Sequence, residues 1–536
     1  MKERPAKIGT SSLGMVAAAS PEATEAGIRM LREGGNAVDA AVAAAFCLGV
    51  TEPQASGLGG QTMGLVYFEE GRKTVAVDGS SRAPFGIDPT RTPSRPAKAG
   101  LASSTLPSTP AALGYLLETH GLLPLERVLQ PAIEAAREGF RVTALLHRLI
   151  KREREQLSLD PLASKRLLPG GEPLATGALL AQPELARCLK TLAREDWRDF
   201  FMGSVAAEIL ADMGARGGML SRVDLAQVPI PIERPALLGR YRRHKLATFP
   251  PPGAGRALVE ILNILETFAP EEIRMDRPDA HVILAHVFMN ALRDRDRRPV
   301  DADLYAQSRR RRMVDKRYAE RIARRIRDLA GLHPAFPPAP PATAGETTHL
   351  CAADADGNVV GITQSIERVF GSKRMNPACG FFYNNYMTTF DYRDMTHPYY
   401  LLPGASPWSS VAPTMLFRRG KPWMILGSPG SERIATALAQ VITRTVDAGM
   451  PLDAAIAAPR MHTGKTGKIQ IERSRFDDEV IRALERAGFS LTRRGAYSFY
   501  LGCVQAIQLP LSRKDPFLGV ADPRRDGTAG GPEKPR

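Results

Sequence analysis

Two hydroxyl-bearing residues lie at matching ends of a predicted β-hairpin and could do nucleophilic chemistry. Thr347 precedes the run 349–354, and Ser365 lies near the end of the run 358–366, with Asp356 and Gly357 in the turn between them. Glycine tolerates positive φ at little steric cost, so this turn favours a hairpin. If residue 354 pairs with residue 358, Thr347 falls opposite Ser365. A two-residue loop would shift the pairing by one residue, so both registers stay open at this point.

Thr347 becomes a strong nucleophile if the chain is cut before it. A threonine hydroxyl needs a base to take its proton, and the free amine of an N-terminal threonine can be that base. This amine forms only if the Glu346–Thr347 bond is broken. The proline-rich segment 334–345 predicts an extended, solvated linker that lets the new chain end withdraw. The alternative is that Thr347 and Thr348 simply open an ordinary strand, because threonine is common in strands.

A glycine-rich turn further along the chain could hold a developing oxyanion. Residues 423–426 predict a strand and residues 432–446 predict a helix, and the segment Gly427-Ser428-Pro429-Gly430-Ser431 joins them. Backbone N–H groups at the start of a helix are good donors to an anion. Most junctions of this kind are structural, so the turn alone does not establish an active site.

The remaining sequence predicts a mixture of helices and strands. Ser20 and Asn36 are suitable N-caps for the first two helices. Residues 100–300 are mainly helical by their apolar periodicity. The predicted helices include residues 21–31, 37–48, 125–137, 205–213 and 258–268, and further strands are predicted at residues 65–68 and 381–386. Residues 392–407 form a loop long enough to be a lid, and the polar segment 513–536 is expected to end in disorder.

The glycine-rich stretch 57–64 does not predict a nucleotide site. A dinucleotide-binding loop enters a helix, whereas this stretch precedes the predicted strand 65–68 and has Thr62 within it. We expect its glycines to permit close approach of backbones at a sheet.

Composition and charge bound the class of protein. The 536 residues are 43% apolar and carry a formal net charge of +15, with much of the excess between Arg293 and Arg327. Apolar residues recur there at helical spacing without a nucleic-acid-binding signature, so we expect a solvated basic helix face and no nucleic-acid partner. The five cysteines form no CxxC pair, which argues against a disulfide framework and a zinc site.

No segment predicts a membrane anchor or a targeting peptide. The longest apolar run, residues 40–50, is too short to cross a bilayer and indicates a buried helix. The first residues are charged and have no apolar segment behind them. We therefore expect a cytoplasmic protein with no membrane partner.

Several motifs together resemble the γ-glutamyltransferase family of N-terminal-nucleophile hydrolases. They occur in the family's order and span nearly the whole chain. The matching stretches are residues 34–42, 51–53, 57–60, 138–140, 250–255, 347–349, 356–358, 370–372, 384–385, 409–410, 413–414, 427–430 and 522–527. The resemblance implies an α/β (α+β) fold, namely a four-layer αββα sandwich, made as a precursor that cuts itself between Glu346 and Thr347. A large chain, residues 1–346, and a small chain, residues 347–536, would then remain associated as one body.

The resemblance also implies the catalytic roles. Thr347 would be the nucleophile, with its freed amine as base. Ser365 stands where the family has a threonine that is hydrogen-bonded to the nucleophile, and the hairpin argument reaches the same pairing independently. Gly430 and Ser431 match the two backbone donors of the oxyanion hole. No cofactor and no metal ion are expected.

The substrate-recognition residues depart from the family's pattern. Ser80 stands where γ-glutamyl-specific members have an arginine that clamps the substrate's α-carboxylate, and Arg82 lies two residues further on. Losing such a contact costs on the order of 1.5–3 kcal/mol unless Arg82 replaces it. Glu367 replaces an asparagine, Tyr386 a glutamine or glutamate, and Thr389 an aspartate. The candidate substrate-binding residues are Arg82, Glu367, Tyr386, Ser409 and Ser410, of which the two serines are retained from the family.

The leading hypothesis is a self-processing threonine amidohydrolase or acyltransferase. It would act on γ-glutamyl amides such as glutathione, with water or an amine as acceptor. One alternative is hydrolysis of another small carboxylated acyl amide without γ-glutamyl specificity. A second is an inactive, basic scaffold or binding protein, which would persist as one intact chain.

Overall fold

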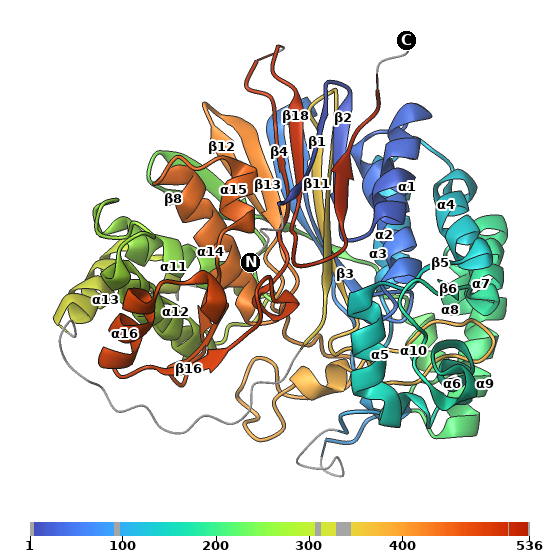
Figure 1. Ribbon diagram of the computed structural model, residues 1–536. Coiled ribbons are helices and arrows are strands. Elements are labelled where there is room, and N and C mark those ends of the chain that lie inside the picture. The colour runs from blue at the N-terminus through green and yellow to red at the C-terminus, as the bar shows by residue number, and fades with distance from the viewer. Residues whose placement is uncertain (1–4, 90–96, 306–311, 329–344, 513, 534–536) are drawn as a thin grey trace.

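Two seven-stranded antiparallel sheets face each other at the centre of the computed structural model, and helices cover both outer faces (Figure 1). The structure describes residues 5–89, 97–305, 312–328, 345–512 and 514–533. Residues 334–344 of the predicted linker 334–345, and residues 534–536 of the predicted disordered end, lie outside these ranges. The four layers confirm the predicted αββα sandwich.

The two sheets take strands from distant parts of the sequence. The first sheet has the order β1-β18-β17-β13-β12-β9-β8, and the second has the order β19-β2-β10-β11-β3-β4-β7. The strands of the first sheet are β1 (Lys7–Ser11), β8 (Leu237–Tyr241), β9 (His244–Thr248), β12 (Thr414–Arg418), β13 (Lys421–Gly427), β17 (Gln505–Gln508) and β18 (Phe517–Ala521). Those of the second are β2 (Gly14–Ala18), β3 (Gln61–Phe68), β4 (Lys73–Gly79), β7 (Ile232–Pro235), β10 (Thr348–Asp354), β11 (Val359–Ser365) and β19 (Thr528–Gly530).

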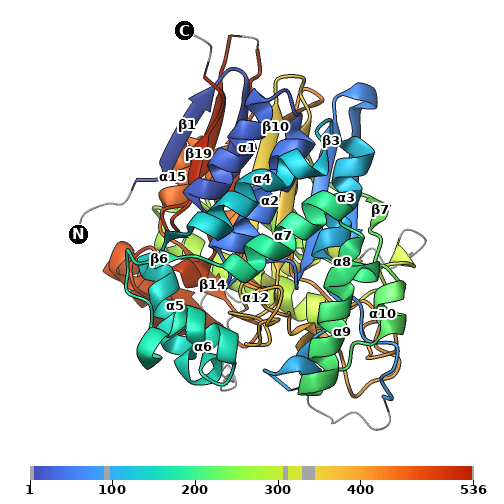
Figure 2. The same ribbon diagram turned by 90° about the vertical axis from the view of Figure 1, so that its right-hand side faces the viewer.

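One helical layer packs on the second sheet, and Figure 2 shows α1, α2, α4 and α7 lying across its strands. The helices on this side are α1 (Pro21–Arg32), α2 (Ala37–Thr51), α3 (Thr109–His120), α4 (Leu125–Glu138), α5 (Ala144–Leu157), α6 (Pro161–Leu167), α7 (Pro183–Glu195), α8 (Asp199–Met202), α9 (Ser204–Arg216) and α10 (Arg222–Ala226). A short two-stranded sheet, β5 (Phe140–Arg141) and β6 (Leu179–Leu180), joins them.

The other helical layer packs on the first sheet. Its helices are α11 (Gly255–Glu266), α12 (Pro278–Arg297), α13 (Lys316–Asp328), α14 (Arg433–Val446), α15 (Leu452–Ala457) and α16 (Asp478–Arg486). A three-stranded sheet, β14 (Met461–Thr463), β15 (Lys468–Ile471) and β16 (Ser490–Arg493), lies beside them. The described part of the chain contains no helix long and apolar enough to cross a bilayer.

Local sequence explains why α1 and α2 form where they do. Ser20 Oγ accepts the N–H of Ala23, and Asn36 shares reciprocal hydrogen bonds with Asp39 in a capping box. These contacts satisfy backbone donors that the first turn of a helix leaves free. Helix α2 is buried along almost its whole length because small alanine and valine side chains let it fit between the sheet and α4. Both predicted N-caps are confirmed.

Three expectations from the sequence need correction. Residues 381–386 are buried but do not form a regular strand, because the backbone N–H groups of Asn384 and Asn385 donate to the carbonyl oxygens of Gly59 and Ile366 rather than to a neighbouring strand. Strand β3 begins at Gln61, within the glycine-rich stretch, rather than at residue 65. The polar segment after residue 513 also contributes β18 and β19, one strand to each sheet.

The basic helices have the predicted solvated face. Tyr318, Ile322 and Ile326 of α13 are buried against the core, whereas Arg321 and Arg324 are exposed. The burial of one stripe and the exposure of the other follow from the 3.6-residue period of a helix.

Candidate active site

The hairpin β10–β11 brings Thr347 and Ser365 together. Residue 353 pairs with residue 359, and the N–H of Asp354 donates to the carbonyl of Asn358 at 3.2 Å. This register carries back to the start of β10, where Thr347 Oγ1 donates to Ser365 Oγ at 3.3 Å. The turn relies on Gly357, whose φ is +96°. The three-residue loop, and with it the predicted pairing of the two hydroxyl groups, is confirmed.

Ser365 also contacts the peptide bond that would be cut. Its Oγ donates to the carbonyl oxygen of Glu346 at 2.8 Å and accepts the N–H of Glu367 at 2.9 Å. A donor to this oxygen stabilises negative charge that develops there when the carbonyl carbon is attacked. Ser365 therefore lies between the attacking hydroxyl and the carbonyl group that it would attack.

A buried ion-pair network holds the side chain of Glu346. Arg525 pairs with Glu346 through Nη2 and with Glu52 through Nη1, the latter at 2.9 Å. The N–H of Thr347 donates to Glu346 Oε1 at 3.3 Å, and Thr348 Oγ1 donates to Glu52 at 2.5 Å. Burial raises the pKa of Glu52, and the charge of Arg525 opposes this shift. The network holds the side chain of Glu346 next to the peptide bond that is predicted to be cut.

Sequence reasoning missed the roles of Glu52 and Arg525. Both residues lie inside stretches, 51–53 and 522–527, that resemble the family, so the signal was present as a motif. Nothing in the sequence indicates that these two stretches meet at Glu346, because the contacts join residues far apart along the chain.

Two predicted recognition residues, Glu367 and Tyr386, lie beside Ser365. Glu367 has a φ of +77°, an unusual value for a residue other than glycine. Burial raises its pKa, and the guanidinium groups of Arg368 and Arg433 oppose the shift. Burial and the nearby carboxyl group of Glu367 raise the pKa of Tyr386 well above its usual value. Glu367 thus contacts Ser365 through its backbone N–H, and the phenol group of Tyr386 forms a hydrogen bond with the same serine.

The turn between β13 and α14 faces the segment upstream of the scissile bond. Gly430 has a φ of +127° and Ser431 a φ of +53°. A Cβ added to Gly345 would lie 2.9 Å from Ser431 Cβ, so the backbones approach closely here. The backbone N–H groups of Gly430 and Ser431 have no acceptor among the described residues. They are therefore free to donate to an anion, and their role as oxyanion donors stays a prediction.

The remaining recognition candidates, Arg82, Ser409 and Ser410, make no contact with Thr347 that the structure shows among the described residues. Ser409 and Ser410 are buried, and the N–H of Ser409 donates to Pro252 O at 3.2 Å. Arg82 forms a backbone bridge with Leu106. Within the described residues, no hydrogen bond joins Arg82, Ser409 or Ser410 to Thr347. Their predicted roles in substrate binding stay predictions.

Ser80 cannot stand in for the family's arginine. Its hydroxyl donates to Asp78 Oδ1 at 2.6 Å, and Asp78 in turn pairs with Arg234 at 2.7 Å. The next residue, Ser81, donates to Gln61 through its N–H and its hydroxyl, at 3.0 and 3.2 Å. This stretch is therefore held in place by protein contacts rather than free to clamp a carboxylate.

Comparisons with known proteins identify the family. The sequence pattern of gamma-glutamyltranspeptidase matches residues 23–531. The chain is 32% identical over 542 residues to the glutathione hydrolase proenzyme of Escherichia coli K12, covering 96% of this chain and 92% of the relative. It is 34% identical over 507 residues to the acylase ACY 1 proenzyme of Pseudomonas sp. strain V22, covering 91% and 88%.

A solved structure shows the same arrangement of elements. The cephalosporin acylase from Bacillus halodurans superposes with a TM-score of 0.87 at 26% identity, covering 100% of this chain and 98% of the other. Its agreement extends over both sheets and both helical layers of the described residues. By family pattern, by sequence relatives and by fold, the chain belongs to the gamma-glutamyltranspeptidase family.

Proposed function

We propose that the chain cuts itself between Glu346 and Thr347 and then cleaves acyl amides with the hydroxyl of Thr347. One observation carries the proposal: the hydroxyl of Ser365 lies 3.3 Å from Thr347 Oγ1 and 2.8 Å from the carbonyl oxygen of Glu346. The same serine can therefore orient the attacking oxygen and polarise the bond that is attacked.

Scission would proceed through an ester. Thr347 Oγ1 attacks the carbonyl carbon of Glu346, the C–N bond breaks, and the hydroxyl proton ends on the released amine. Water then hydrolyses the ester. The products are a new carboxylate on Glu346 and a Thr347 with a free hydroxyl group and a free amine.

Cleavage of an amide substrate would use the same oxygen with a new base. The freed amine of Thr347 takes the proton of Oγ1, which attacks the substrate's carbonyl carbon. The N–H groups of Gly430 and Ser431 would hold the oxyanion, and the departing amine takes the proton. Water resolves the resulting ester in hydrolysis, and an amine resolves it in transfer.

We propose γ-glutamyl amides such as glutathione as the substrate class. Relatives named glutathione hydrolase proenzymes, in Escherichia coli and Bacillus subtilis, support this class. Because Ser80 is held by Asp78, another residue must bind the substrate's carboxylate. The guanidinium group of Arg82 has no hydrogen-bond or ion-pair partner among the described residues and is the first candidate. Ser409, Ser410, Glu367 and Tyr386 would line the rest of the site.

The interleaved sheets support continued association of residues 1–346 with residues 347–536. Strands β10 and β11 follow the proposed cut, yet they pair with β2 and β3, which precede it. In the first sheet β12 likewise pairs with β9 across the same divide. Separating the two parts would break hydrogen-bond ladders in both sheets.

The test combines mass spectrometry with a small amide panel. We expect purified protein to give two chains of about 37 and 21 kDa, in proportion to their shares of 58.2 kDa, with the smaller starting at Thr347. A γ-glutamyl anilide should be turned over faster than simple acyl anilides of similar size. Thr347→Ala should stay a single chain and lack activity.

Each outcome separates one alternative. Persistence of one full-length chain after long incubation would favour the inactive scaffold. Two chains that hydrolyse only the simple anilides would favour an amidohydrolase without γ-glutamyl specificity. Thr347→Ala protein that matures and hydrolyses amides would contradict the proposal altogether.

A further inference from the structure

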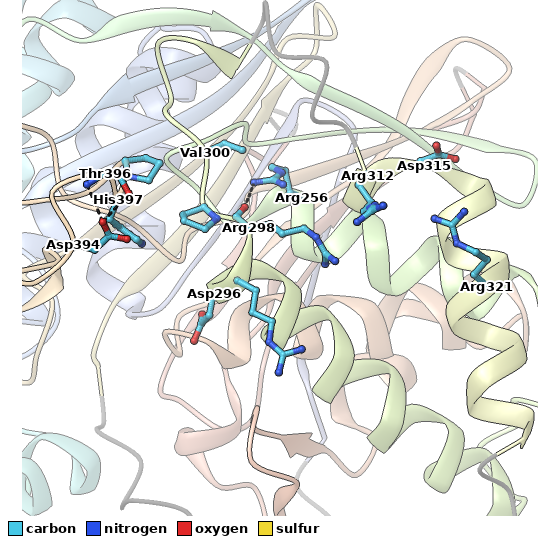
Figure 3. Close-up of a pocket in the computed structure, with 13 residues that line it drawn as sticks. Arg256, Asp296, Arg298, Val300, Arg312, Asp315, Arg321, Asp394, Thr396 and His397 are labelled. Atoms are coloured by element: carbon cyan, nitrogen blue, oxygen red, sulfur yellow. Dashed lines mark hydrogen bonds between the residues drawn. The ribbon is translucent and has the colours of Figure 1, made fainter.

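A hollow with several arginines in its lining opens on the surface, outside the proposed catalytic centre (Figure 3). Its volume is about 870 Å³. It lies between the C-terminal end of α12, the start of α13 and the loop 394–398. Five arginines and three aspartates line it: Arg256, Arg297, Arg298, Arg312, Arg321, Asp296, Asp315 and Asp394.

Three of these arginines lie around the aromatic ring of Tyr318. The guanidinium carbons of Arg298, Arg312 and Arg321 lie 5.2, 5.5 and 5.4 Å from the centre of the Tyr318 ring. Figure 3 shows the three side chains directed into the same space. Of the three, only Arg298 has a carboxylate partner among the described residues, Asp294. Like charges this close repel one another, and the repulsion weakens when an anion is bound between them.

A fourth arginine is buried at the inner end of the hollow. Arg256 is only 7% exposed, and its Nη1 donates to the carbonyl of Arg298 at 3.1 Å. Its Nε has no acceptor within the described residues, and burial lowers the pKa of this guanidinium group. A buried guanidinium with unused donors is unfavourable unless a ligand or solvent satisfies them.

None of the three aspartates forms an ion pair with an arginine of the hollow among the described residues. Asp296 pairs with Arg295 at 2.7 Å and with Lys465 at 2.6 Å. Asp315 and Asp394 each accept a backbone N–H from two residues further along the chain and keep their negative charge. Five arginines face three aspartates, so the lining has an excess of positive charge.

We propose that the hollow binds a small polyanion, a molecule with two or more carboxylate or phosphate groups. Guanidinium groups present several donors in a planar fork that matches such oxyanions two bonds at a time. The cavity is large enough for a molecule of this size, and Arg256 would meet the innermost acid group while Arg312 and Arg321 meet the outer ones. This site goes beyond the proposed amide cleavage.

A smaller cavity lies next to the hollow, on the side of Ser409. A second cavity, of only about 30 Å³, shares Arg256, Pro299 and Val300 with it and reaches Trp408, the neighbour of Ser409. The polyanion could therefore be the far end of an amide substrate, or a separate anion that binds next to it. Both sources present the same acid groups to the same arginines.

Calorimetric titration of the full chain with inorganic pyrophosphate tests the site. We expect one pyrophosphate per chain, with affinity reduced at least about tenfold in Arg312→Gln/Arg321→Gln. The matched control for Arg321→Gln is Arg324→Gln, which removes one exposed charge from the same helix but does not line the hollow. It should bind like the natural protein. The single variants, Arg312→Gln and Arg321→Gln, should each show an intermediate loss, which guards against a folding defect in the double variant.

Two results would overturn the proposal. One is the absence of pyrophosphate binding to the natural protein. The other is an equal loss of affinity in Arg324→Gln and the double variant, which would show only a general effect of net charge. Neither result depends on amide cleavage, so failure here is distinguishable from failure of the proposed function.

Kinetics with amide substrates would identify the source of the anion. If the hollow holds the far end of a substrate, pyrophosphate should compete with amides that carry a distal acid group, and the double variant should raise KM for those amides alone. If it holds a separate anion, pyrophosphate should bind without competing, and KM should stay unchanged. Either pattern supports an anion site and assigns its role.

Discussion

The scission site and the basic hollow treat charge in opposite ways. At the scission site each buried charge has a partner, since Arg525 lies between Glu346 and Glu52, and Thr348 completes the carboxylate of Glu52. In the hollow four arginines have no carboxylate partner among the described residues. The ion pairs at Arg525 hold one geometry within the chain itself, although Arg525 Nε has no hydrogen-bond partner among the described residues. The arginines of the hollow that lack a carboxylate partner instead leave room for an anion from outside the chain. The comparison supports our proposals that the first region serves a reaction of the chain and that the second binds a ligand.

Ser365→Ala should cause the largest change at the paired region. Removing the hydroxyl takes away both the donor to the Glu346 carbonyl and the acceptor of the Thr347 hydroxyl. Loss of one donor to a developing oxyanion costs about 10²-fold in rate, so scission should slow by about that factor. The rate is measured as loss of full-length chain on denaturing gels.

Ser365→Thr is the matched control, because it keeps the hydroxyl group. It should mature at a rate within about tenfold of the natural protein. Equal rates for Ser365→Ala and the natural protein would show that the serine takes no part in scission.

Arg525→Gln should slow scission about tenfold, the equivalent of losing a charge-assisted hydrogen bond worth roughly 1.5 kcal/mol. It leaves two buried carboxylates without their cation. The double variant Glu346→Gln/Arg525→Gln should be no slower than Arg525→Gln alone, because the two residues act through one contact. The same gel assay, with urea unfolding to compare stability, measures both.

Glu346→Gln alone completes this double-mutant cycle. If the effects of the two single variants on the scission rate add fully in the double variant, the proposed action of the Arg525–Glu346 ion pair is contradicted. Additive effects would mean that Arg525 and Glu346 affect scission independently, through general destabilisation rather than through their ion pair.

The pH dependence of stability should report on the buried centre. His349 lies between the sheets, where its ring contacts Thr363, Cys351 and the backbone at Gly427, and burial lowers its pKa to about 3. Between pH 6.5 and about 3, the imidazole of His349 therefore binds a proton in the unfolded chain but stays neutral in the folded chain. The contribution of the neutral His349 ring to the free energy of unfolding is present in full above pH 6.5. It is lost as the pH falls toward 3, by about 1.4 kcal/mol per pH unit.

His349→Gln removes that contribution. Between pH 6.5 and 5, its free energy of unfolding should fall less steeply than that of the natural sequence, by up to about 1.4 kcal/mol per pH unit. Urea unfolding in an uncleaved Thr347→Ala background keeps the comparison to one chain. An unchanged slope would show that His349 is not buried as a neutral ring.

Added salt should weaken anion binding in the hollow but should hardly change the rate of scission, which is the smallest effect predicted. Screening acts strongly on exposed charges and weakly on buried pairs. Raising the salt from about 0.1 to about 0.5 M should weaken pyrophosphate binding at least about tenfold, yet change the scission rate less than about twofold. Arg312→Gln should likewise leave scission within about twofold. A scission rate as salt-sensitive as pyrophosphate binding would remove the distinction between the regions.

The parts of the structure that depend on local sequence are those that could be predicted. The turn at Gly357 sets the register of the hairpin, and that register alone places Thr347 at Ser365. The caps at Ser20 and Asn36 act within one helical turn. The turn at Gly430 is likewise recognisable because a strand and a helix flank it.

The parts that depend on distant contacts could not be predicted. Residues 381–386 have the composition of a strand, but Asn384 binds backbone groups from two remote loops instead of a neighbouring strand. Strand β18 is apolar but lies in a segment that is polar overall, and its place in the sheet depends on pairing with β1 from the start of the chain. The role of Arg525 has the same character, since only the folded chain brings it to Glu346.

The position of Arg525 in the sequence has a consequence for the order of events during synthesis. A ribosome makes residue 525 long after it has made residues 346 and 347. A half-made polypeptide that has already formed β10 and β11 still lacks the cation that holds Glu346. If the ion pair between Arg525 and Glu346 governs the rate of scission, an unfinished chain would not be cut. The free amine of Thr347 would then form only after the C-terminal strands have joined the sheets.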